Sequence, residues 1–301
     1  MSNIENDSQR LIDLLKQRTL ETRVRALLHR WYAFYERDAK NFDHQFELLA
    51  DDFVIIRPPE SDFESVQGKE AYRKSLRGIP FGQESAHWFE TLEVTPATDA
   101  SLKAVVSHRY HTRDPARRGA ALLRYDLRLV DDGSLLPRLT SLQESVVHTH
   151  EELFRDAYGE NRAASFVFYW LSVLERMDGR AEPLRELFPA EFEMHLSSGD
   201  RIHTWHHVTQ WIAGQAAQVR MSAHRLRNLA VHPGPDDSYE VSMEFLWEGI
   251  TETGQALIAH TKHDWVLLER GGRYPLLKTF RVRALKPFTP VSIAEALAHG
   301  S

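Results

Sequence analysis

The sequence of 301 residues contains no cysteine, and this absence excludes several kinds of site. Disulfide bonds, thiolate nucleophiles and cysteine-bound zinc or iron–sulfur clusters all need this residue. A positive net charge is also missing. The formal charge is −6, so we expect neither a nucleic acid nor an anionic membrane as a partner. Serine-hydrolase elbows, phosphate-binding loops and dinucleotide fingerprints are absent from the sequence, and we therefore expect no cofactor.

Long apolar runs are missing as well. No stretch reaches the roughly 20 apolar residues that are needed to cross a bilayer. Residues 1–10 are too polar and acidic for the core of a secretory signal, and both observations favour a cytoplasmic location. The composition, with 42% hydrophobic and 27% charged residues, is that of an ordinary globular protein. Because single domains usually hold about 100 to 200 residues, the length predicts two domains.

An internal repeat supports the two-domain prediction. Trp31 and Glu36 recur as Trp170 and Glu175, 139 residues later. Further pairs at offsets of 137 to 139 residues are Leu48 with Leu187, Phe53 with Phe192, His87 with His224, Asp126 with Asp264, and Pro137 with Pro275. Small loop insertions would leave such slight changes of offset, so the collinear series indicates a duplication.

Each copy places helices before strands. Apolar residues three and four positions apart predict helices early in each copy, and alternating apolar residues predict strands later. The predicted helices are 27–35 and 42–50 in the first copy and 166–174 and 182–188 in the second, and the clearest strands are 102–110 and 239–247. Helices followed by a run of antiparallel strands predict the α+β class.

These patterns divide the chain into five expected segments. We expect, in order, an N-terminal helical extension, a first repeat, a connector, a second repeat and a C-terminal tail, at residues 1–25, 26–147, 148–164, 165–285 and 286–301.

Several short motifs resemble one known superfamily. They are the runs Asn41–Asp43, Leu48–Phe53 and Gly68–Ala71 of the first copy, and Ser222–His224 with Asn228 in the second. Together they resemble the nuclear transport factor 2-like superfamily, and the last segment resembles its SnoaL-like polyketide cyclase branch. The resemblance implies two cone-shaped domains with a cystatin-like α+β roll, in which a strongly bent antiparallel sheet wraps around the N-terminal helices and leaves a pocket.

The resemblance also carries functional expectations. Relatives include ketosteroid isomerase and scytalone dehydratase, so it implies a small apolar or aromatic ligand and acid–base isomerisation, cyclisation or dehydration. Many relatives pair through their sheets, which implies an intrachain pseudo-dimer of the two domains; a higher oligomer is left open. Because fold similarity does not transfer function, the site has to be argued residue by residue.

Two pocket positions in each copy follow from the resemblance. Dehydratases of the superfamily carry a carboxylate on the first helix, and the corresponding residues here are Tyr35 and Leu174, neither of which ionises near neutral pH. We therefore expect that general acid or base to be missing. His87 and His224 occupy the position at which many members of the superfamily have a histidine that points into the pocket. The ordinary pKa of a histidine, about 6.5, suits proton transfer, so we predict both residues as catalytic. The structural alternative is that each histidine ties a strand to a helix in the core.

Other polar and aromatic residues are candidates for ligand binding. They are Tyr35, His108, Tyr110 and Tyr125 in the first copy, and Trp247 and His263 in the second. Aromatic walls with few polar anchors are usual in small-molecule sites, although strand aromatics more often serve as core packing. His203, His206 and His207 lack the intervening glutamate of a metalloprotease, and we expect no metal site.

Two classes of function stay open after these observations. The first is an acid–base enzyme that uses His87 or His224 as proton carrier. The second is a non-catalytic binding or assembly module whose pockets are filled by side chains. Because the copies differ, with Tyr35 against Leu174 in the helix position, we predict that at most one copy encloses an open cavity.

Overall fold

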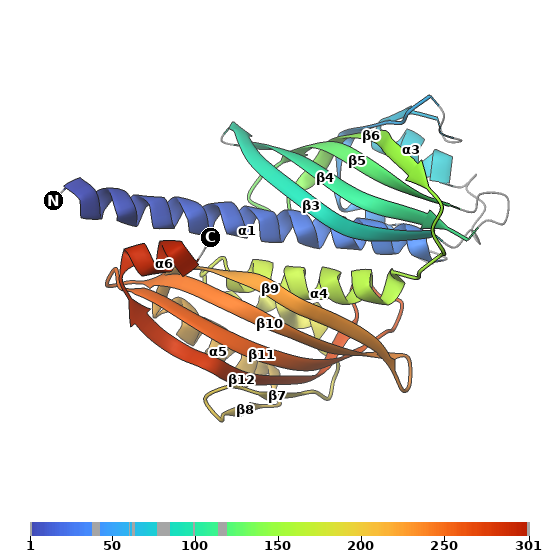
Figure 1. Ribbon diagram of the computed structural model, residues 1–301. Coiled ribbons are helices and arrows are strands. Elements are labelled where there is room, and N and C mark those ends of the chain that lie inside the picture. Colours follow the sequence, from blue (N-terminus) through green and yellow to red (C-terminus); the bar gives the residue numbers. More distant parts are fainter. Residues whose placement is uncertain are drawn as a thin grey trace. The chain divides into compact units, whose positions relative to one another are not determined.

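The structure, a computed structural model, describes residues 2–37, 43–59, 61, 64–76, 85–98, 100–113 and 119–299 (Figure 1). It divides into two compact units, one of Arg23–Ser165 and one of Met1–Thr22 together with Phe166–Ser301. None of the described helices is both long enough and apolar enough to cross a membrane. Asn41 and Phe42, which belong to the family-like motifs, lie outside the described residues.

The first repeat consists of helices followed by a six-stranded sheet. Its elements are α1 (Ser2–Glu36), α2 (Asp43–Phe46), β1 (Leu49–Ile56), β2 (Val66–Gln67), α3 (Lys69–Leu76), β3 (Ser85–Thr98), β4 (Ser101–Thr112), β5 (Gly119–Val130) and β6 (Arg138–His150). The strand order is β2-β1-β6-β5-β4-β3. Strands β1 and β6 are parallel and the other neighbours are antiparallel.

The second repeat has the same order of elements and the same sheet. It consists of α4 (Tyr158–Leu174), the 3₁₀ helix η2 (Glu182–Leu187), β7 (Glu193–His195), β8 (Arg201–Ile202), α5 (Trp205–Ala216), β9 (Val219–Gly234), β10 (Ser238–Thr251), β11 (Ala256–Leu268), β12 (Leu276–Val291) and α6 (Ile293–His299). The strand order β8-β7-β12-β11-β10-β9 matches that of the first sheet strand for strand. The predicted duplication and α+β class are therefore confirmed.

Alternation along the strands decides which face packs on the helices. Val241, Met243 and Phe245 on β10 are at most 2% exposed, while Glu240 and Glu244 lie on the opposite face. The first long strand of each sheet also bends at an irregularity in its pairing. In β9 this irregularity contains Asn228 with a φ of 52°, a left-handed conformation that asparagine tolerates better than most residues.

The structure shows which elements occupy three of the expected segments. The expected helical extension is the first part of α1, which runs without a break from Ser2 to Glu36. The expected connector is non-helical up to Tyr158, where α4 begins. The expected C-terminal tail contains the end of β12 and the short helix α6.

The first part of α1 is built into the unit of the second repeat. Leu11 and Leu15 are completely buried in one apolar cluster with Ile250, Ile258 and Ala296, which come from β10, β11 and α6. Burial of leucine side chains supplies most of the free energy that holds such a segment in place. The N-terminal residues are therefore part of this unit's core.

We predict that Leu15→Ala lowers the free energy of unfolding by about 2–5 kcal/mol, the range for a fully buried leucine. Lys16→Ala, at the exposed neighbouring position, should change it by no more than about 0.5 kcal/mol. Urea unfolding followed by tryptophan fluorescence measures both values. Equal effects of the two substitutions would contradict a core role for this part of α1.

Candidate functional site

A buried carboxylate holds a histidine from two directions in the second repeat. Glu175 directly follows α4, and His224 lies near the start of β9. The Oε1 atom of Glu175 accepts hydrogen bonds from the backbone N–H of His224 at 2.8 Å and lies 3.1 Å from its Nδ1. The Glu175 side chain is 1% exposed and that of His224 is 13% exposed. The carboxylate is thus sealed in the interior while the imidazole stays accessible.

The first repeat contains the same pair. Oε1 of Glu36, the last residue of α1, accepts from the backbone N–H of His87 at 2.6 Å and lies 3.2 Å from its Nδ1. Asn161 completes this arrangement: its Nδ2 donates to both carboxylate oxygens, at 2.8 and 3.1 Å, and to the carbonyl of His87 at 2.9 Å. The Oδ1 atom of Asn161 lies 2.7 Å from Nδ1 of His29.

The hydrogen bonds define which ring nitrogen is available for chemistry. An ionised carboxylate only accepts, so Nδ1 of His224 carries the proton that it donates to Glu175. The Nε2 atom then keeps a free lone pair and can act as a base. Burial raises the pKa of the Glu175 carboxyl, and hydrogen bonds from His224 and Thr22 act in the opposite direction. The partners of Glu175 therefore offset part of the cost of burying its charge.

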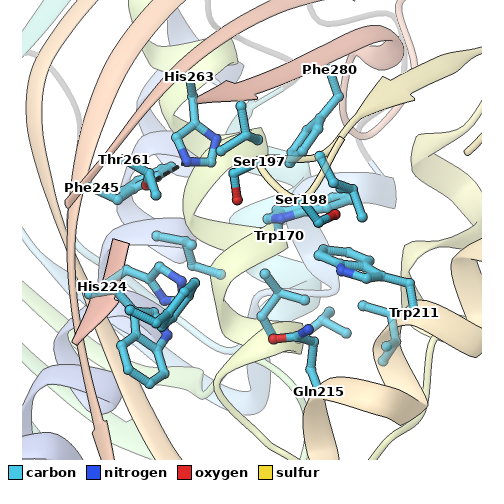
Figure 2. Close-up of a pocket in the computed structure, with 18 of the residues that line it drawn as sticks. Trp170, Ser197, Ser198, Trp211, Gln215, His224, Phe245, Thr261, His263 and Phe280 are labelled. Carbon is cyan, nitrogen blue, oxygen red and sulfur yellow. Dashed lines mark hydrogen bonds between the residues drawn. The ribbon is translucent and has the colours of Figure 1, made fainter. Parts of the chain in front are cut away.

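His224 lines a cavity of ≈ 510 Å³ in the second repeat. Figure 2 shows His224 and His263 on the sheet side of this cavity, with Trp211 and Gln215 of α5 across from them. The aromatic lining residues are Trp170, Trp211, Phe245, Trp247, Phe280 and Phe288, and the polar ones include Ser197, Ser198, Gln215, Thr261, His224 and His263. Since Trp170 is 1% and Phe288 is 52% exposed, the cavity extends from the core to the surface.

His263 is the second imidazole of this cavity and has a different character. Its Nε2 lies 2.8 Å from the hydroxyl of Thr261. Burial, together with the nearby His224, lowers the pKa of His263 to about 3, so His263 stays neutral at physiological pH. Phe245 meets both rings edge-on, with centroid distances of 5.7 Å to His224 and 4.7 Å to His263. Trp247, predicted with His263 as a ligand residue, also lines the cavity.

The predicted residues of the first repeat gather around His87. The ring of Tyr35 lies 6.5 Å from that of His87, His108 lies 5.5 Å away and Tyr110 lies 5.2 Å away. Tyr125 contacts His108 at 4.4 Å between centroids. His108 is fully buried, and burial lowers its pKa well below the ordinary value. These four residues therefore share one interior with His87.

The expectation that the first helix carries no general acid or base at its pocket position stays a prediction, and a carboxylate lies at the next position. Leu174 does line the cavity, as the resemblance implied for its position. The next residue, Glu175, turns its carboxylate to the far side of His224, and Glu36 does the same for His87. The signal was present in the sequence, because a glutamate recurs at this helix position in both copies.

No metal-binding cluster is found in the part of the chain that the structure describes. There, no three or more histidine, aspartate or glutamate side chains converge in a way that would hold an ion. His203 and His207 flank the start of α5, whose N-cap is Thr204. Whether more than one cavity is open stays a prediction.

The chain was compared with known proteins at three levels. No protein-family model and no curated protein matches it. Among solved structures it is similar to a candidate aromatic ring hydroxylase from Novosphingobium aromaticivorans, with 12% identity and a TM-score of 0.41, over 49% of this chain and 100% of that one. It is also similar to a cystatin-like-fold protein from Caulobacter vibrioides, with 11% identity and a TM-score of 0.37, over 43% and 91% of the two chains.

A third similar structure is the hexachlorocyclohexane dehydrochlorinase LinA-type3 from Novosphingobium barchaimii. It has 13% identity and a TM-score of 0.34, over 40% of this chain and 82% of that one. Each of these matches thus spans no more than half of this chain and most of the similar chain. The tandem arrangement of two α+β units is confirmed by the two sheets of matching strand order.

Buried neutral histidines predict an acid-sensitive fold. The pKa values of His263 and His29 are lowered to about 3 and about 4, chiefly by burial. Between these values and about 6.5 the unfolded chain binds protons that the folded chain does not, so the free energy of unfolding should rise with pH through this window and level off above it. We predict that His263→Phe reduces the slope by up to about 1.4 kcal/mol per pH unit.

Urea unfolding at a series of pH values between 4 and 8 measures this slope. His203→Phe, at an exposed histidine, is the matched control and should leave the slope unchanged. A slope that is the same in both variants and in the parent protein would show that His263 is not held neutral.

Proposed function

We propose that the second repeat is an acid–base site for a small apolar or aromatic substrate, with His224 as proton carrier. The observation that supports this most directly is an accessible imidazole that lines a ≈ 510 Å³ cavity and is bound through Nδ1 to a buried glutamate. A histidine in this setting offers Nε2 to the substrate, and general bases of this kind typically contribute about 10² to 10⁴ in rate.

Glu175 has a supporting role in this proposal. It is 1% exposed and does not line the cavity, so it acts on the substrate only through His224. Its carboxylate fixes the tautomer and the orientation of the ring and stabilises the imidazolium that forms when Nε2 takes a proton. Glu175 is thus a positioning residue.

The lining defines the class of substrate. Six aromatic side chains form much of the wall of the cavity, and six polar side chains interrupt it, so a flat or compact ring with a polar substituent fits best. The Nε2 atom of His224 can take a proton from a substrate carbon that lies next to an activating group. Isomerisation and elimination both start with that step, in line with the dehydrochlorinase among the similar structures.

A general carbon acid tests the proposal without knowledge of the natural substrate. In 5-nitrobenzisoxazole, transfer of the ring C–H proton to a base breaks the N–O bond, forms a nitrile and releases a coloured phenolate. We predict that the parent protein accelerates this reaction and that His224→Gln lowers kcat by about 100-fold or more. Glu175→Gln should lower kcat with little change in KM, because it leaves the walls of the cavity intact.

The alternative function is a non-catalytic binding module. It is favoured by Leu174, an apolar residue that lines the cavity with His224. Controls separate the two functions. His203→Gln, at an exposed position, should react like the parent protein. Binding of the same compound is followed through quenching of the cavity tryptophans. Quenching in the parent protein and in His224→Gln, with equal and slow elimination in both, would support the binding module and exclude the proposed base.

A further inference from the structure

A buried carboxylate joins three distant parts of the second unit. The side chain of Glu248 lies on the face of β10 that also carries Glu244, and it is 1% exposed. It forms ion pairs with Arg18 of α1 and, at 3.4 Å, with Arg225 of β9. Its Oε1 atom also lies 3.0 Å from Nδ1 of His299, the last residue of α6. Arg18, Arg225, Glu248 and His299 are called here the α6 latch.

The charges around the latch disfavour a proton on His299. Two guanidinium groups already share the single negative charge of the buried carboxylate. The strand pairing adds His260 of β11 and Lys286 of β12 to the same face, in one row with Arg225. His260 in turn lies 2.8 Å from the carboxylate of Glu244. A protonated His299 is therefore a further cation among like charges.

This surplus of positive charge determines the direction of the pH dependence. Burial, followed by the charges of Arg225, Lys286, Arg18 and His260, lowers the pKa of His299. When α6 is released into solvent, the imidazole regains the ordinary pKa of about 6.5. The released state then binds a proton that the closed state does not bind. Release is therefore favoured as the pH falls below about 6.5, and the latch stays closed above this value.

Helix α6 depends on its surroundings because it is short. It spans seven residues, Ile293–His299, and isolated helices of this length do not form in water. A capping box of Ser292 and Glu295 fixes its start, and Ala296 is buried in the apolar cluster with α1. The latch fixes its end and also binds the carbonyl of His299.

The segment before α6 forms part of the cavity rim. Ala284, Pro287 and Phe288 of β12 line the cavity, and Phe288 is 52% exposed. The pairing of this stretch with β11 contains two irregularities, and the pairing of β12 with β7 ends at Arg281. A strand segment with an interrupted ladder on one side opens at a low cost in free energy. The rim is thus held between the regular part of β12 and α6.

We propose that the α6 latch is a proton-sensitive switch of the second repeat, in which a proton on His299 releases α6 and frees the cavity rim of β12. The regulation of substrate entry by this switch rests on the proposed function. Release of α6 itself does not, because the four latch residues lie outside the cavity lining.

An introduced thiol reports on release, since the chain has no cysteine of its own. Leu297→Cys places the thiol against the apolar cluster, and Ala294→Cys places it at an exposed position of the same helix. The two rates of reaction with a pyridyl disulfide are compared at each pH, so that the effect of pH on the reagent and on thiol ionisation cancels. We predict that Leu297→Cys is protected at pH 7.5 and loses up to about tenfold of this protection at pH 5.5, one pH unit below the ordinary pKa of histidine.

Three substitutions in the Leu297→Cys protein test the assignment to His299. His299→Asn keeps an N–H near the position of Nδ1 but takes no proton, so its protection should be equal at both pH values. Lys286→Gln removes one repelling charge and should reduce the loss of protection in acid. His232→Gln, at an exposed histidine, is the matched control and should respond to pH like the parent protein.

Two results would overturn the latch. One is protection in the parent protein that does not change with pH, and the other is an equal loss of protection in the parent and in His299→Asn. If His299→Asn is open at both pH values, Lys286→Gln decides, and an unchanged response of that variant overturns the latch. None of these results involves the substrate, so they leave the test of His224 with 5-nitrobenzisoxazole unaffected.

Discussion

The hydrogen bonds that one glutamate oxygen accepts from the backbone and the ring of a histidine determine much of this structure. In each repeat this atom joins the end of the first helix to the start of the first long strand, through Glu36 and His87 or Glu175 and His224. The carboxylate lies at the C-terminal end of its helix, where the helix dipole disfavours negative charge. Its hydrogen bonds must therefore offset both that repulsion and the loss of solvent.

Each of these pairs receives one more partner, and the two partners correspond in sequence. Asn161 of α4 binds Glu36 and the backbone of His87, and Thr22 of α1 acts to lower the pKa of Glu175 against the effect of burial. These two residues are 139 positions apart, the offset of the repeat itself. An amide with two N–H bonds and a hydroxyl with one do not stabilise a carboxylate equally, so the duplicated pairs have acquired different surroundings.

The duplication and the fold class followed from the sequence because they rest on many positions at once. Alternating residues such as Val241 and Phe245 defined β10, and the offsets defined the second copy. Single positions were harder to predict. Pro287 and Pro290 indicated a tail, yet β12 continues through them, because in that stretch it pairs with β11 alone and a missing N–H on the free side costs little.

The carboxylate that binds each histidine was missed for a similar reason. Consecutive residues of a helix point about 100° apart. A residue that is one position from the one the resemblance identifies therefore faces the neighbouring strand and not the cavity. Leu174 lines the cavity, and the carboxylate that binds His224 belongs to the next residue, Glu175. The histidines were predicted from the same resemblance, and their assignment as proton carriers stays a prediction, as does the pseudo-dimer.

The division of α1 between the two units has a consequence for biosynthesis. The unit Arg23–Ser165 is continuous in sequence and is complete once its last residue has left the ribosome. The other unit joins the first 22 residues to the second half of the chain, so Leu11 and Leu15 wait for β10, β11 and α6, the last of which ends at His299. Leu11 and Leu15 are thus synthesised long before the strands and the helix that bury them.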